Sequence, residues 1–158
     1  MKTVTIHTDG SCLGNPGSGG WAAVLTCEGP SGTARREMGG GFARTTNNRM
    51  EILAVLEALS ALKTPCAVEL YTDSQYVSRA IRDRWLEGWQ KNGWRTAAKK
   101  PVKNQDLWRR MAEVLARHEV RFHWLKGHAG HTENERCDEL ARAWANRSDL
   151  PEDSGFDG

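Results

Sequence analysis

The sequence predicts an α/β protein with a mixed sheet covered by helices, and two observations carry this prediction. In the first third of the chain, short alternating or apolar segments follow one another with glycine- and proline-rich turns between them, which is typical of an antiparallel meander. In the remainder, segments with helical spacing alternate with short apolar segments. That alternation favours parallel neighbours joined by crossover helices.

Five segments are predicted to be strands, namely residues 2–8, 21–27, 33–42, 67–72 and 120–125. In the first, Val4 and Ile6 alternate with threonines, as expected for a strand with one buried face. The third is the weakest because it ends at three consecutive glycines.

Four segments have helical spacing, namely residues 50–62, 74–85, 106–117 and 132–144. In the second, Val77, Ile81 and Trp85 fall at i, i+4 and i+8, which places all three in the core. In the fourth, Thr132 is expected to be the N-cap, with Glu135 three residues later completing a capping box.

Residues 1–147 are predicted to form a single domain, and the acidic residues 148–158 a disordered tail without a site. No apolar run approaches the ~18 residues of a membrane span, and the N-terminus shows no signal sequence. We therefore expect a cytoplasmic protein with no membrane partner, and a monomer by default. The four cysteines have no metal-ligand spacing and are expected to be reduced thiols.

The net charge is only +2, but it is unevenly distributed. Between Gly88 and Gln105 there are five basic residues and no acidic one. Such a basic segment indicates either contact with a polyanion or a solvated surface loop. The charge alone leaves both interpretations open.

Four carboxylates stand out by position. Asp9 and Asp73 end two predicted strands, Glu51 lies in the first turn of a helix, and Asp138 lies near the start of the last helix. If the two strands are parallel neighbours, their ends meet at the sheet edge where such folds bind ligands. Clustered carboxylates repel one another unless a cation joins them, and a site with oxygen ligands alone favours Mg²⁺ or Mn²⁺ over zinc. Two such ions can support in-line phosphoryl displacement without a protein nucleophile.

Each carboxylate also has a purely structural alternative. A capping box with Asn48 would account for Glu51, and an i, i+4 ion pair with Arg142 would account for Asp138. The two strand-end aspartates could be turn formers or helix caps. The pattern of residues alone leaves a metal site and these alternatives open.

Four segments together resemble the bacterial type of ribonuclease H, in the order and spacing of that family. They are residues 8–17 (TDGSCLGNPG), 45–51 (TTNNRME), 72–77 (TDSQYV), and 126–131 with 134–141 (KGHAGH and NERCDELA). The resemblance extends over about residues 3–147. It implies a ribonuclease H-like fold, a five-stranded mixed sheet with three antiparallel strands and then parallel strands, flanked by helices. It also implies an endonuclease that cleaves the RNA strand of RNA–DNA hybrids, leaving 5′-phosphate and 3′-hydroxyl ends.

The resemblance further implies the residues of the active site. Two Mg²⁺ ions, with Mn²⁺ as a substitute, would be held by the four catalytic carboxylates Asp9, Glu51, Asp73 and Asp138. His128, on a glycine-flanked loop, would help to move protons or release product. The residues implied to contact the hybrid in the minor groove, or to hold a DNA phosphate in the case of Thr46, are Cys12, Asn15, Thr46, Asn47, Asn48 and Gln75.

The basic segment resembles the family's protruding handle, which grips the DNA strand. The residues expected to make this contact are Trp89, Lys91, Trp94, Lys99 and Lys100. Gln90 and Asn92 flank Lys91, where the family can have a denser run of basic residues. We therefore expect the binding of hybrid to depend less steeply on salt than with a handle that carries two more charges.

Two alternatives share the same scaffold. A DNA resolvase or integrase-like nuclease would lack the 47–51 arrangement and the handle. A catalytically inactive hybrid-binding protein would be expected to have lost a carboxylate, and all four are present.

Overall fold

The computed structural model describes residues 1–126 and 131–157. Its strands are β1 (Lys2–Leu13), β2 (Gly17–Gly29), β3 (Gly32–Thr45), β4 (Cys66–Thr72) and β5 (Glu119–Trp124). Its helices are α1 (Asn47–Ser60), α2 (Gln75–Arg82), α3 (Trp85–Lys91), α4 (Gln105–Leu115) and α5 (Thr132–Ala145).

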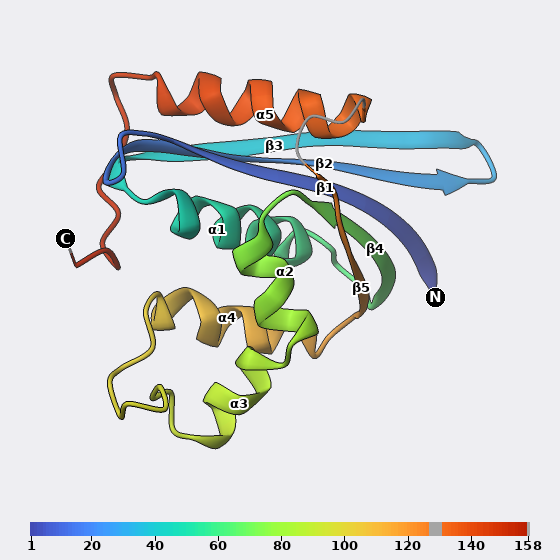
Figure 1. Cartoon of the computed structure of the whole chain (residues 1–158). Coiled ribbons are helices and arrows are strands. Elements are labelled where there is room, and N and C mark those ends of the chain that lie inside the picture. The colour runs from blue at the N-terminus through green and yellow to red at the C-terminus, as the bar shows by residue number, and fades with distance from the viewer. Residues whose placement is uncertain (127–130, 158) are drawn as a thin grey trace.

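The strands form one mixed sheet in the order β3-β2-β1-β4-β5 (Figure 1). The first three pair antiparallel, whereas β4 pairs parallel with β1 and β5 pairs parallel with β4. The predicted meander followed by parallel strands is confirmed.

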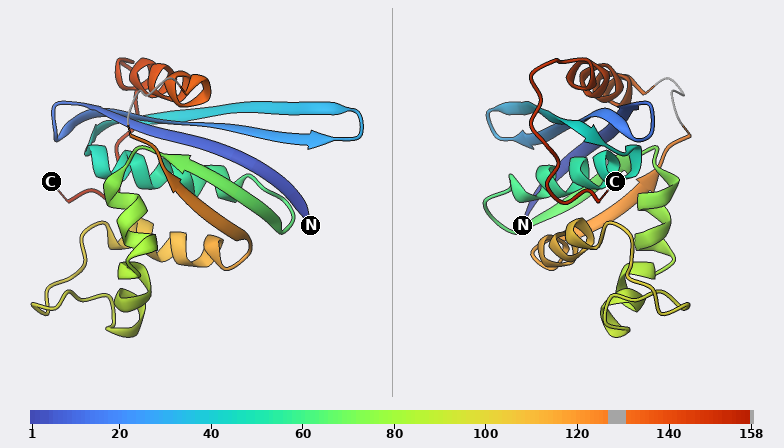
Figure 2. Two further views of the ribbon diagram at one scale, coloured as in Figure 1. Left: turned by 45° about the vertical axis from the view of Figure 1, so that its right-hand side comes forward. Right: turned by 90° about the vertical axis from the view of Figure 1, so that its left-hand side faces the viewer.

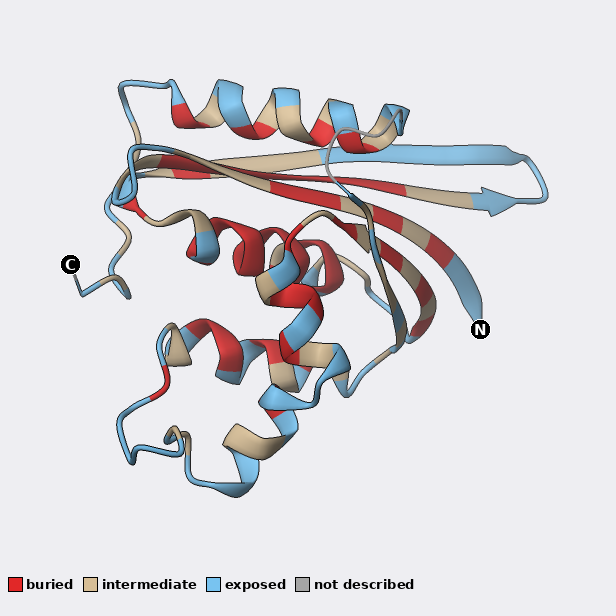
Figure 3. Ribbon diagram, in the orientation of Figure 1, coloured by how far each residue is buried: buried red, intermediate tan, exposed pale blue. Residues whose placement is uncertain are grey.

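Helices cover both faces of the sheet. Helix α5 packs on β1, β2 and β3 from one side, while α1 packs on β1 and β2 from the other and is itself covered by α4 (Figures 1 and 2). Helix α1 is consequently buried along most of its length, whereas α5 buries only the side facing the sheet (Figure 3). This explains why α1 is apolar on nearly all sides.

Several boundaries differ from the prediction, and helix α3 was not predicted; two of these differences concern the strand that carries Asp9 and the helix that follows Asp73. Strand β1 continues past Asp9 to Leu13, because Asp9 to Leu13 still pair with β2 after the pairing with β4 ends at Thr8 and Thr72. The helix predicted over 74–85 ends at Arg82, and Arg84 adopts a left-handed conformation (φ 60°) before α3.

This break changes the placement of Trp85. Because the helical register is lost after Ile81, Trp85 does not continue the buried stripe and is 38% exposed. The expectation that Trp85 belongs to the core was wrong. The expected capping box at α5 is also absent, since Thr132 is already helical and His131 occupies the N-cap position without a side-chain bond.

The segment for which the sequence predicts a disordered tail makes specific contacts with the domain. Asp153 accepts from Arg49 Nε at 2.8 Å and from the Thr45 hydroxyl at 2.7 Å, and Arg49 is only 3% exposed. The Pro151 carbonyl also accepts from the backbone N–H of Ala43 at 2.8 Å. A buried guanidinium needs such carboxylate partners, and this need draws the acidic segment onto the domain.

Within the described ranges, no helix is both long enough and apolar enough to cross a membrane. The four cysteines are free thiols, as predicted.

Candidate active site

Two of the predicted carboxylates lie together where the pairing between β1 and β4 ends. The last paired residues are Thr8 and Thr72, and Asp9 and Asp73 follow them directly in the chain. Asp9 is 4% exposed and its Oδ1 accepts from the backbone N–H of Gly10 at 2.9 Å. The parallel register therefore sets both aspartates at one edge of the sheet, as the sequence predicted.

Helix α1 contributes the third carboxylate. Glu51 is 5% exposed, and one ligand oxygen from each of Asp9, Glu51 and Asp73 lies within 4.8 Å of the others. The helix begins at the Thr46 cap, whose hydroxyl accepts from the backbone N–H of Arg49 at 3.2 Å. Thr46 therefore fills the capping role, and Glu51 is free to face β1.

The cluster is electrostatically strained without a cation. Burial, and then the charge of Asp73, raise the pKa of Asp9 to about 8. Burial and the neighbouring charge of Asp9 also raise the pKa of Glu51 well above its usual range. The Oε1 of Glu51 is buried and has no hydrogen-bond partner among the described residues. Three oxygen donors with one unsatisfied buried atom fit a hard divalent cation.

The fourth predicted carboxylate stands slightly apart. Asp138 lines the same cleft and contributes to raising the pKa of Asp9, but it forms an ion pair with Arg142 in the next turn of α5. The position of Asp138 in the cleft agrees with a role in metal binding, and its ion pair with Arg142 agrees with the structural alternative. His128 lies outside the described residues.

The carboxylates open into a cleft of about 370 Å³. Three of the predicted hybrid-contacting residues, Asn47, Asn48 and Gln75, line it. Asn15 and Thr46 instead line an adjoining hollow that is bordered by residues of the tail. Cys12 donates its thiol hydrogen to the carbonyl oxygens of Gly17 and Thr45, at 3.5 and 3.4 Å.

The handle residues are only partly available to a ligand. Trp89 is half-buried against Trp108, with ring centroids 5.6 Å apart, and Lys91 pairs with Glu87 at 3.5 Å. Trp94 is half-buried beneath the guanidinium of Arg109, 5.0 Å from its ring centroid. Lys99 and Lys100 are exposed.

Two residues that sequence reasoning missed support the cleft. Tyr76 lines it, and its hydroxyl accepts from Trp108 Nε1 at 3.0 Å, which ties α2 to α4. Gly10 lies so close to α1 that an added Cβ would sit 2.7 Å from the Glu51 nitrogen and 2.8 Å from the Met50 carbonyl carbon. Both residues belong to conspicuous sequence segments, but nothing in those segments indicates the packing.

We expect Gly10→Ala to destabilise the protein by about 1–3 kcal/mol, because the new methyl group meets backbone atoms of α1 that can move only with the helix. The displacement would carry Glu51 away from Asp9, so cleavage should fall as well. Denaturant unfolding and turnover assays measure both effects. Gly88→Ala is the matched control, since a Cβ there has no neighbour within 4 Å. Equal stability of the two variants would contradict the close approach.

The fold and this site together define a class of protein, an α/β protein with a carboxylate cluster that could hold a metal ion at the edge of its sheet.

Comparisons with known proteins give the family. A sequence model described as RNase H matches residues 1–146. The ribonuclease H of Nitratidesulfovibrio vulgaris (strain DP4) is 65% identical over 153 residues, covering 97% of this chain and 96% of that protein. That of Oleidesulfovibrio alaskensis (strain ATCC BAA-1058 / DSM 17464 / G20) is 63% identical over 154 residues, covering 98% and 97%.

Among solved structures, LC9-RNase H1, described as a type 1 RNase H with the type 2 active-site motif, matches with a TM-score of 0.82 and 32% identity. The match covers 92% of this chain and 72% of that one. The chain belongs to the ribonuclease H family. The family, fold class and enzyme class predicted from the sequence are confirmed.

Proposed function

We propose that this enzyme cleaves the RNA strand of RNA–DNA hybrids at the cleft formed by Asp9, Glu51, Asp73 and Asp138, with Mg²⁺ as its cofactor and Mn²⁺ as a substitute. The observation that carries the proposal is the group of three ligand oxygens within 4.8 Å of one another at the sheet edge. When bound, two such ions would activate water and stabilise the leaving oxygen of the cleaved phosphodiester.

Packing and ion pairing within the protein position the carboxylates that would bind the metal ions. Asp9 and Glu51 are buried, so their carboxylates are kept in place by packing rather than by solvent. Asp138 is anchored by Arg142 and completes the rim of the cleft. His128 is assigned a role in proton movement or product release from the sequence alone.

Recognition of the hybrid is assigned to amide side chains beside the carboxylates. Asn47, Asn48 and Gln75 face the cleft and can both donate and accept hydrogen bonds. Such groups suit base edges and the 2′-hydroxyl, which distinguishes RNA from DNA. Asn15 Oδ1 accepts from the backbone N–H of Asn47 at 3.2 Å and steadies the start of α1. Cys12 and Thr46 are also assigned to the hybrid from the sequence, and both side chains are hydrogen-bonded to nearby backbone.

The DNA strand is assigned to the handle. Lys99 and Lys100 are exposed and suited to phosphates, with Lys91, Trp89 and Trp94 nearby. We also propose a cytoplasmic monomer, which sedimentation of the purified protein and fractionation of cells would test.

The experiment that tests this function presents one labelled sequence as RNA–DNA hybrid, RNA duplex, DNA duplex and single-stranded RNA, each with Mg²⁺ or with chelator. Cleavage of only the hybrid's RNA strand, abolished by chelator, is expected. Tight hybrid binding without cleavage would instead indicate an inactive hybrid-binding protein. Cleavage of the DNA duplex would indicate a resolvase or integrase-like nuclease.

A further inference from the structure

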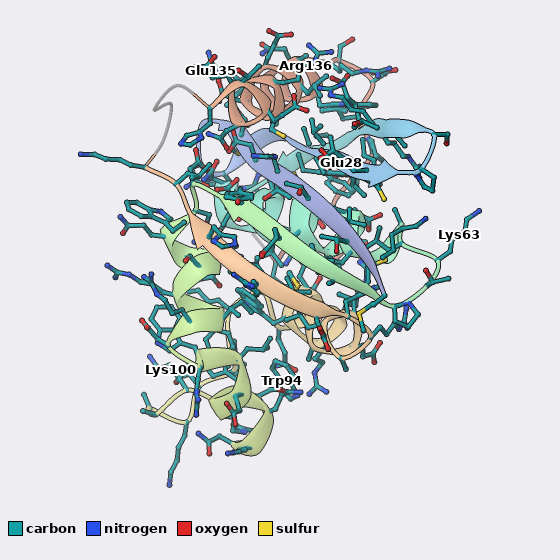
Figure 4. The ribbon with its side chains drawn as sticks, turned by 90° about the vertical axis from the view of Figure 1, so that its right-hand side faces the viewer. Glu28, Lys63, Trp94, Lys100, Glu135 and Arg136 are labelled. Carbon is teal, nitrogen blue, oxygen red and sulfur yellow. The ribbon has the colours of Figure 1, made fainter. Side chains whose placement is uncertain are left out.

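A second, positively charged hollow adjoins the acidic cleft. Gln75, Arg79 and Arg82 lie at i, i+4 and i+7 of α2 and therefore on one face of the helix. Together with Ser78 and with Trp124 of β5, they line a hollow of about 160 Å³, which we call the α2–β5 hollow. Figure 4 shows the edge of the molecule where α2 lies beside β5, with Trp94 and Lys100 of the handle beyond α2.

The α2–β5 hollow begins where the cleft ends. Gln75 lines both. Trp124 donates its indole N–H to the backbone carbonyl of Asp73 at 3.2 Å, and the Asp73 carboxylate belongs to the cluster. A strand lying across the carboxylates would therefore meet the α2–β5 hollow next to Gln75.

The charges in the hollow are available to a ligand. Over residues 1–126 and 131–157, neither Arg79 nor Arg82 forms an ion pair or a side-chain hydrogen bond. Arg121, also on β5, is by contrast paired with Glu69 at 3.2 Å. Two unpaired guanidinium groups beside a cleft that binds a phosphodiester are suited to further phosphates of the same strand.

Trp124 adds a surface for stacking. It is 39% exposed, which is unusual for so large an apolar side chain. Its N–H is already bonded to the Asp73 carbonyl, so the exposed part of the ring remains for contact with a ligand. An aromatic face of this kind can pack against a ribose of a neighbouring strand.

We propose that the α2–β5 hollow is a binding subsite for the RNA strand next to the cleavage site, in which Arg79 and Arg82 hold backbone phosphates and Trp124 stacks against a ribose. The inference rests on the proposed function, because the strand that crosses the carboxylates is the cleaved one. It names the RNA strand, not the DNA strand, as the occupant.

The first test compares Arg79→Gln/Arg82→Gln with a control that removes the same charge elsewhere, Arg36→Gln/Arg117→Gln. Both control arginines are exposed and, within the described ranges, have no ion pair. With a long hybrid at moderate salt, the α2 variant should raise KM by about fivefold or more and reduce the slope of log affinity against log salt by about 1–2. An α2 variant that matches its control in both quantities would overturn the proposal.

The second test identifies the strand. A single neutral methylphosphonate is moved along the RNA strand, and then along the DNA strand, and hybrid binding is measured in chelator. For the unaltered protein, one or two RNA positions close to the cleavage site should weaken binding. For Arg79→Gln/Arg82→Gln, the same positions should have little further effect, because their partners are already absent. Coupling to DNA-strand positions instead would refute the assignment.

The stacking role has its own matched pair. Trp124→Phe and Trp124→Leu both lose the N–H that binds Asp73, but only phenylalanine keeps an aromatic face. Tighter hybrid binding by Trp124→Phe supports stacking, and equal binding refutes it.

Cleavage by the unaltered protein distinguishes failure of the proposed function from failure of the subsite. If it does not cleave the hybrid, the proposed function fails, whereas if it cleaves and the variants behave as controls, only the subsite fails.

Discussion

Glu51→Gln and Asp73→Asn are each expected to reduce hybrid cleavage by at least about a thousandfold while leaving the protein folded. Each substitution keeps the size and polarity of the side chain but removes a negative charge from the three-carboxylate group. A cation held by the remaining oxygens would lose both a ligand and the charge that opposes its own. Turnover in Mg²⁺ and thermal unfolding of the same samples give the two readouts.

The structure removes the structural alternatives for these two residues. Ser74 caps α2, accepting from the backbone N–H of Val77 at 3.1 Å, so Asp73 is not the cap. Thr46 caps α1, so Glu51 is not part of a capping box with Asn48. A role in helix capping therefore accounts for neither residue, and loss of a cap would not explain an effect of substituting either of them.

Matched substitutions elsewhere serve as controls. Glu57→Gln is the control for Glu51→Gln, because Glu57 also lies on α1 but pairs with Arg110. Asp83→Asn is the control for Asp73→Asn, because Asp83 lies at the C-terminal end of α2. Both should retain full cleavage. Normal cleavage by Glu51→Gln and Asp73→Asn would contradict the assignment of the cluster as the catalytic site.

The topology and the carboxylate positions could be predicted because they depend on local pattern. Strand and helix periodicity give the order of elements, and parallel pairing then brings the residues after Thr8 and Thr72 to one edge. The identity of the site residues came from four sequence segments in family order. Neither source gives the depth of burial, which makes Asp9 and Glu51 so different from surface carboxylates.

Two differences between prediction and structure, at Arg84 and in the tail, involve a backbone conformation or a long-range contact that the local sequence does not indicate. The left-handed conformation at Arg84 is adopted by a residue type that does not signal it, so the helix break there was missed. The acidic composition of the tail predicts disorder and gives no sign that Asp153 pairs with Arg49 across 104 residues. Composition describes a segment in isolation, and it cannot show that a buried charge elsewhere requires that segment.

The raised pKa of Asp9 predicts that the free energy of unfolding of the metal-free protein depends strongly on pH. The folded protein holds a proton on Asp9 up to about pH 8, whereas in the unfolded chain an aspartate releases it near pH 4. Between these values the folded state binds more protons than the unfolded state. The contribution of Asp9 to stability is therefore greatest at low pH and is lost as pH rises through about 8.

In chelator, the free energy of unfolding should thus fall from pH 5.5 to pH 8.5, and more steeply for the unaltered protein than for Asp9→Asn. At pH 8.5 the variant should be more stable by roughly 2–4 kcal/mol, because it carries no charge into the buried cluster. Mg²⁺ should reverse this order, since a cation stabilises the ionised carboxylates and binds Asp9→Asn weakly. Denaturant titrations at three pH values, with and without Mg²⁺, measure both effects, with Asp83→Asn as the control. Parallel pH profiles for the unaltered protein and Asp9→Asn in chelator would mean that the cluster is relaxed without metal. The electrostatic reason for placing a cation there would then be lost, even if the enzyme still required one.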